Sequence, residues 1–145
     1  SINKKINEIS WKPDLIIASY HGIPKKYFDK GDPYHCYCHK TTRLISEKFS
    51  SIKIKTTFQS RFGPQEWLQP YTDKTLESLP EEGVKNVLTI CPGFASDCVE
   101  TLEEIQIQAK ESFLNSGGEN FDMVPCLNDN NDHITLLKSL IERNT

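Results

Sequence analysis

Apolar residues gather in four short runs that are separated by longer segments of mixed polarity. The runs are DLIIASY at 14–20, IKIKTTF at 52–58, NVLTICP at 86–92 and FDMVPC at 121–126. Their length and their content of branched and aromatic residues are typical of strands. The pattern therefore predicts four β-strands.

The intervening segments have the spacing of amphipathic helices. We expect helices from about Lys40 to Phe49, Asp73 to Leu79, Asp97 to Leu114 and Asp132 to Arg143. The glycine pair at 117–118 is a plausible stop for the third helix. Because strand and helix alternate, the sequence predicts an α/β fold with a parallel four-stranded sheet flanked by helices, in one domain over 1–145.

Composition narrows the class of protein. The chain has 145 residues, a net charge of -3 and 37% apolar residues, so nothing indicates a basic surface for nucleic acid. No stretch approaches the ~20 apolar residues of a membrane span. Five cysteines without an export signal predict reduced thiols and a cytoplasmic location. The chain begins with polar residues and no methionine, which suggests a segment of something longer.

Unusual loops follow three of the predicted strands. They read SYHGIP, TFQSRFGP and CPGFASD, and ligands of parallel sheets bind beyond the carboxyl ends of the strands. We therefore expect His21, Arg61, Phe94 and Asp97 to gather on one rim.

Carboxylates on the third helix are the first candidates for chemistry. Glu100 and Glu104 lie four residues apart and should share a helix face, with Gln108 one turn further on. A divalent cation would relieve the repulsion between the two carboxylates. Asp97 and Glu100 also fit an acidic capping box, which requires no chemistry.

His21 and a group of aromatic residues complete the candidate rim. An imidazole facing a carboxylate would make a proton acceptor with a place for a divalent ion, although a lone histidine after a strand is more often structural. The aromatic group could be a small core under a loop or the lining of a pocket for a large flat ligand. Its members are Phe58, Phe62, Trp67, Tyr71 and Phe94.

A short cysteine and histidine segment raises a separate metal hypothesis. Cys36 and Cys38 stand between His35 and His39, so thiolate and imidazole ligands are close in sequence. Structural zinc sites usually have two such ligand pairs, and no second pair is present. Whether this segment binds a metal stays open.

Four sequence blocks resemble the carboxy-terminal half of ferrochelatase, the enzyme that inserts ferrous iron into a porphyrin. They are SYHGIP, KGDPY at 30–34, TFQSRFGPQEWLQPYTDKTL at 57–76 and CPGFASDCVETLEEI at 91–105. The resemblance covers nearly the whole chain. It implies a Rossmann-like chelatase lobe at 1–145 whose partner, an amino-terminal lobe, is absent from this chain.

The resemblance also implies roles for single residues. His21 matches the histidine that accepts pyrrole protons or holds the metal, and Glu100 matches the essential carboxylate across the macrocycle. Glu104 matches a position on a route for metal or protons. Porphyrin contact is implied for Trp67 and Phe94, and we add their neighbour on the first strand, Tyr20. Two positions depart from some relatives: Gln108 replaces an acidic residue, and Cys98 replaces a histidine.

The implied function is a lyase of late heme biosynthesis, with ferrous iron and protoporphyrin IX or a close relative as substrates. No tightly bound cofactor is expected, and no iron–sulfur cluster, because no cysteine follows Cys126. We expect the chain alone to be inactive and its last helix, 132–143, to pack on the missing lobe. Peripheral membrane contact and oligomeric state stay open. The alternatives are a cobalt chelatase acting on another tetrapyrrole and a non-catalytic heme- or metal-binding module.

Overall fold

The computed structural model describes residues 1–144. Its strands are β1 (Leu15–His21), β2 (Lys53–Gln59), β3 (Asn86–Ile90) and β4 (Asn120–Met123). Its helices are α1 (Ile2–Glu8), α2 (Lys25–Asp29), α3 (Tyr34–Ser46), α4 (Thr72–Ser78), α5 (Val99–Leu102), the π-helix η1 (Glu104–Ala109), α6 (Lys110–Asn115) and α7 (Asn131–Asn144). The predicted order of strands and helices is confirmed.

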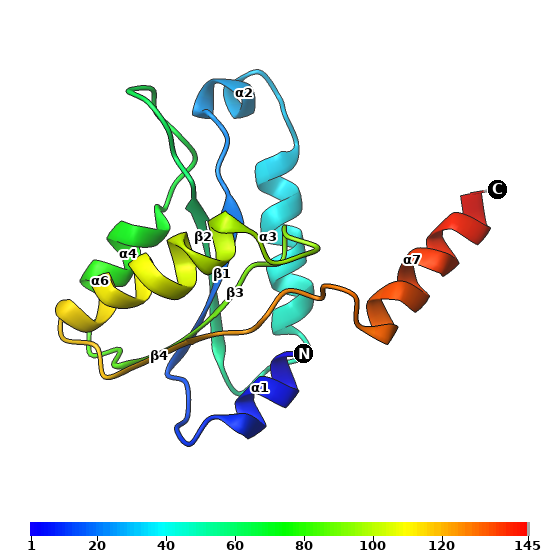
Figure 1. Ribbon diagram of the computed structural model, residues 1–145. Coiled ribbons are helices and arrows are strands. Elements are labelled where there is room, and N and C mark those ends of the chain that lie inside the picture. The colour runs from blue at the N-terminus through cyan, green and yellow to red at the C-terminus, as the bar shows by residue number, and fades with distance from the viewer. Residues whose placement is uncertain (145) are drawn as a thin grey trace.

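The four strands form one parallel sheet in the order β2-β1-β3-β4. Helices α4 and α6 cover one face, and α3 covers the other (Figure 1). Alternate residues of β1 enter the two cores: Leu15 and Ile17 face α4 and α6, whereas Ile16 and Ala18 face α3. Because both faces are covered, β1 is apolar almost throughout, as its sequence predicted.

Helix α3 begins earlier than the pattern predicted. The structure has it at Tyr34–Ser46, so the GDPYHCYCH segment is mostly helix rather than the long loop that we expected. Asp32 accepts a hydrogen bond of 2.9 Å from the backbone N–H of Tyr34, and Pro33 is the N-cap residue. This Asp-Pro start supports the first turn without an apolar pattern.

The predicted helix from Asp97 to Leu114 is interrupted. It is built from α5, η1 and α6, with Asn115 as its last residue. Gly117, at φ 97°, and Gly118 end it as expected, and the N–H of Gly118 donates 3.0 Å to the carbonyl of Phe113. The π-helical segment was not predicted, and it changes which side chains share a face.

Helix α7 confirms the predicted last helix and lies apart from the sheet and its covering helices (Figure 1). His133 is buried in its first turn. The helix also exposes a series of large apolar side chains: Ile134, Leu136, Leu137, Leu140 and Ile141. Within residues 1–144, no helix combines the length and the apolar character that crossing a membrane would need.

Candidate active site

The candidate site lies at the carboxyl ends of β1, β2 and β3. His21 ends β1 and is in register with Gln59, which ends β2. The N–H of Gly22 donates 2.8 Å to the carbonyl of Gln59, and a Cβ at position 22 would come within 3.0 Å of that oxygen. Glycine therefore allows the two loops to leave the sheet side by side, and the predicted rim is confirmed for these strands.

His21 is half-buried, and its backbone and ring are both fixed. Its Nδ1 lies 2.7 Å from the carbonyl oxygen of Gly22, and its own carbonyl accepts 2.8 Å from the hydroxyl of Tyr34. A carbonyl only accepts, so Nδ1 carries the hydrogen in this contact. In the neutral ring, Nε2 then keeps its lone pair and can accept a proton or bind a cation.

Two aromatic rings lie near His21. The ring centroids of Trp67 and Phe94 are 6.5 Å and 6.4 Å from that of His21. Trp67 is itself held by a hydrogen bond of 2.9 Å from its Nε1 to the carbonyl of Phe62. Of the aromatic group, Trp67 and Phe94 therefore lie close to the histidine, whereas Phe58 is buried in the core and Phe62 is 83% exposed.

Tyr20 lies elsewhere. Its side chain is only 3% exposed, and its hydroxyl is 3.0 Å from that of Thr42 on α3. Burial raises the pKa of Tyr20 to about 12. The structure thus places Tyr20 in the core beneath the rim and not on the surface where a porphyrin would contact it.

Glu100 lies in the short helix α5, close to the histidine. Hydrogen bonds from the Cys98 side chain and from its own backbone N–H lower the pKa of Glu100, and the charge of His21 lowers it further. These contacts favour the ionised carboxylate. His21 and Glu100 therefore interact electrostatically.

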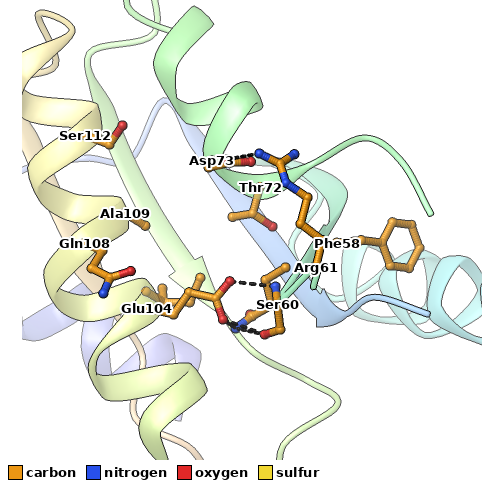
Figure 2. A pocket seen from close by; sticks show the side chains of 11 residues that line it. Phe58, Ser60, Arg61, Thr72, Asp73, Glu104, Gln108, Ala109 and Ser112 are labelled. Carbon is orange, nitrogen blue, oxygen red and sulfur yellow. Dashed lines mark hydrogen bonds and ion pairs between the residues drawn. The ribbon is translucent and has the colours of Figure 1, made fainter. Parts of the chain in front are cut away.

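Glu104 is held by residues at the end of β2. Its carboxylate accepts hydrogen bonds from the N–H and the hydroxyl of Ser60, at 2.6 Å and 2.5 Å, as Figure 2 shows. Glu104 and Gln108 line a pocket of about 340 Å³ between α4 and the π-helix, and Glu100 is not among its lining residues. Of the expected row, Glu104 and Gln108 thus share one pocket, and residues 104–109 are π-helical rather than α-helical.

The acidic capping box expected from Asp97 and Glu100 is also wrong. Cys98 is the N-cap of α5, and its backbone N–H bonds to the hydroxyl of Thr101. Burial by itself would raise the pKa of Asp97, but hydrogen bonds from Asn128 and from the N–H of Cys126 outweigh it and lower the pKa. Asp97 therefore ties the loop before α5 to the loop after β4.

The cysteine and histidine segment does not assemble a metal site. On α3, Cys36 is exposed and Cys38 is buried, as expected for residues two positions apart on a helix. His35 and His39 pack as aromatic rings, with centroids 4.4 Å apart. Over the described part of the chain, no group of three or more His, Cys, Asp or Glu side chains is placed to hold a metal ion.

Two residues of the site were not predicted from the sequence. Gln59 and Ser60 were read only as part of a loop, yet both contact Glu104. The available signal was two polar residues directly after a buried strand on the predicted rim.

Comparison with known proteins gives consistent results. A family model described as Ferrochelatase matches residues 1–145. The curated ferrochelatase of Rhizobium meliloti (strain 1021) is 56% identical over 99% of this chain, and that of Agrobacterium fabrum is 50% identical over 99%. The chain spans only 43% and 42% of those relatives.

A solved structure shares the fold at low sequence identity. It is named as a cobalamin (vitamin B12) biosynthesis CbiX protein from Marinobacter aquaeolei VT8, with a TM-score of 0.57 and 13% identity. The match covers 91% of this chain and 97% of that one. The sequence match over its whole length shows that the chain belongs to the ferrochelatase family.

Proposed function

We propose that this chain is the carboxy-terminal lobe of a ferrochelatase and supplies His21 and Glu100 for the insertion of ferrous iron into a porphyrin. The observation that carries the proposal is the half-buried His21, with Nε2 left as the acceptor and the rings of Trp67 and Phe94 beside it, together with the ionised Glu100. Family membership supports the same reading.

Metal insertion into a porphyrin requires two proton acceptors and a non-polar surface that binds the flat ring. A free porphyrin carries two inner N–H protons, and both must leave as the divalent metal binds to the four nitrogens. His21 accepts one proton at Nε2, the ring nitrogen whose lone pair is left free by the contact of Nδ1 with the Gly22 carbonyl. The carboxylate of Glu100 attracts the incoming cation or takes the second proton.

The two aromatic side chains position the substrate. Trp67 and Phe94 offer ring faces and edges against which a porphyrin can pack close to the histidine. Holding the macrocycle out of plane would expose its inner nitrogens, at a strain of ~1–5 kcal/mol supplied by contacts elsewhere on the ring.

The rest of the proposed cleft belongs to a second lobe. The chain spans 43% of the length of a close relative, and α7 exposes apolar side chains that its own fold leaves uncovered, such as Leu137. We propose that the amino-terminal lobe packs on α7 and faces the rim. Slow amide exchange over 131–144 in the full-length protein, with fast exchange in the isolated chain, would support this packing.

We also propose that the full-length protein is a lyase, that it is cytoplasmic and that it contacts a membrane peripherally. Phe62 is 83% exposed beside Trp67, so it offers one apolar contact for a lipid surface. Co-sedimentation with anionic vesicles that falls in Phe62→Ser would support that contact. We also propose that porphyrin and ferrous iron are substrates, with no resident cofactor or iron–sulfur cluster, which iron and sulfide analysis of the purified protein tests.

One observation favours a second candidate function. The likeness in fold to a protein named for cobalamin (vitamin B12) biosynthesis extends over 97% of that chain. A cobalt chelatase that acts on another tetrapyrrole is therefore the alternative, and a non-catalytic heme- or metal-binding module comes after it.

The experiment that tests the proposal is metal insertion followed by absorbance. Protoporphyrin is supplied with ferrous iron, or with cobalt, to the isolated chain and to the full-length protein. Iron insertion by the full-length protein alone supports the two-lobe ferrochelatase. Insertion of cobalt only, or porphyrin binding without insertion of either metal, would favour one of the alternatives.

A further inference from the structure

Gln59 connects the sheet to the helix that carries both candidate carboxylates. Its side chain is 4% exposed. Its Oε1 accepts 2.7 Å from the hydroxyl of Ser19 on β1, and its Nε2 donates 2.6 Å to the backbone carbonyl of Glu100 and 3.2 Å to the carboxylate of Glu104. Nε2 also lies 3.4 Å from the hydroxyl of Ser60, and because the carbonyl and the carboxylate can only accept, the orientation of the amide is fixed.

The contact with Glu100 falls where the helix changes type. In an α-helix a carbonyl accepts from the N–H four residues later, but here the N–H of Gln108 bonds to the carbonyl of Glu103, five residues back, at 3.0 Å. A side chain that enters the backbone ladder is one of the recognised causes of such irregularity. Gln59 enters it at Glu100, in α5, about one turn before η1 begins at Glu104.

Ser60 extends the same contact to Glu104. It has a positive φ of 62°, which is unusual for a serine. In this conformation both its N–H and its hydroxyl point at the Glu104 carboxylate (Figure 2). The carboxylate is therefore held by three donors from two consecutive residues at the end of β2.

Buried hydroxyl groups form a chain of hydrogen bonds that ends at the Gln59 amide. The hydroxyl of Ser19 lies 2.8 Å from that of Thr72, and Thr72 contacts Thr57 at 2.8 Å. Each of these side chains is at most 2% exposed. A buried network of this kind is rigid when its members are satisfied, so it fixes the position of the Gln59 amide.

We propose that Gln59 is a positioning residue that sets the π-helical path of 104–109, directing Glu104 into the pocket and leaving Glu100 on the side of His21. The effect of Gln59 on turnover rests on the ferrochelatase function proposed above. The effect of Gln59 on the helix does not depend on that function, and it can be measured without turnover.

The test compares three variants of the full-length protein by amide hydrogen exchange. Gln59→Met removes the amide at similar size, and Gln59→Asn keeps the amide on an arm one methylene shorter. Gln106→Met is the matched control, because Gln106 is exposed on the same π-helix. We expect exchange over 104–109 to become about tenfold faster or more in both Gln59 variants, with α3 unchanged and Gln106→Met silent. Gln59→Asn keeps the test usable if Gln59→Met fails to fold.

Turnover measurements on the same variants then distinguish a positioning role of Gln59 from a general effect on the stability of the fold. Gln59→Met should lower kcat for insertion about 10- to 100-fold, as loss of an orienting partner does, while KM for porphyrin stays within about twofold. Exchange over 104–109 that equals the unmutated protein, or that rises equally in α3, would overturn the proposal. If the unmutated protein inserts no metal, the function fails while the exchange result still decides the role of Gln59.

Discussion

The hydroxyl of Tyr34 donates a hydrogen bond of 2.8 Å to the backbone carbonyl of His21. This bond joins the first turn of α3 to the last residue of β1, and so holds the strand end from which the candidate base projects. Tyr34 is half-buried, so water replaces the bond only in part.

Loss of this hydroxyl should therefore weaken the fold. We expect Tyr34→Phe to lower the free energy of unfolding by about 1 kcal/mol, measured by urea denaturation. Tyr37→Phe is the matched control, since Tyr37 is 61% exposed on the same helix and should change little. Equal effects of the two variants would show that the bond to His21 contributes nothing.

Gly118 should not tolerate a side chain. A Cβ at this position would lie 2.2–2.6 Å from ring carbons of Phe113, which is fully buried. Gly118→Ala should thus destabilise the protein by about 1–3 kcal/mol through overpacking. Gly93→Ala is the comparison, because the nearest atom to a Cβ there is 3.5 Å away. Thermal unfolding of both variants measures the difference, and similar midpoints would contradict the clash.

Asp97 should make stability depend on pH in the acid range. A carboxyl whose pKa is lower in the folded chain stabilises the fold above its unfolded pKa and loses that contribution as pH falls through the folded value. The folded pKa of Asp97 lies below 3.8, held there by Asn128 and Cys126 against the effect of burial.

Asp97→Asn should then cost on the order of 1 kcal/mol at pH ~7. The difference from the unmutated protein should shrink as pH falls below about 3.8. Unfolding by urea at a series of pH values measures this convergence. A constant difference down to the lowest pH would mean that ionisation of Asp97 plays no part.

The cysteines should differ strongly in reactivity. Cys36 is exposed, whereas burial raises the pKa of Cys38 and raises that of Cys126 to about 12. Because the thiolate is the nucleophile, iodoacetamide at mild alkaline pH should label Cys36 well before Cys38 and Cys126. Mass spectrometry of peptides at successive times measures the order, and Cys36→Ser should remove the early label. Early labelling of Cys38 would contradict its burial against the sheet.

Much of the fold could be predicted because its signals are local. The apolar run at 14–20 is buried on both faces of the sheet, and so is visible as a run. Gly117 and Gly118 end the third helix through a backbone geometry that the sequence shows directly. The early start of α3 was missed because it depends on Asp32 and Pro33 rather than on an apolar period.

The site was predictable in position but not in orientation. The ends of parallel strands meet at one edge, so His21 and Phe94 could be placed on one rim from their order alone. The direction of Glu104 depends on Gln59 and Ser60, which are more than forty residues away in sequence. A helix period takes no account of such contacts, so the hydrogen bonds of Glu104 could not be predicted from the sequence.

The central claim is that His21 and Glu100 carry metal insertion while the aromatic pair binds the ring. The most direct measurement is ferrous insertion into protoporphyrin by the full-length His21→Ala and Glu100→Gln variants, with porphyrin binding followed by fluorescence. Glu103→Gln is the matched control, because Glu103 is exposed on the same stretch of helix. We predict loss of insertion in the two site variants, with porphyrin binding retained and Glu103→Gln unaffected. Turnover close to that of the unmutated protein in either site variant would contradict the account.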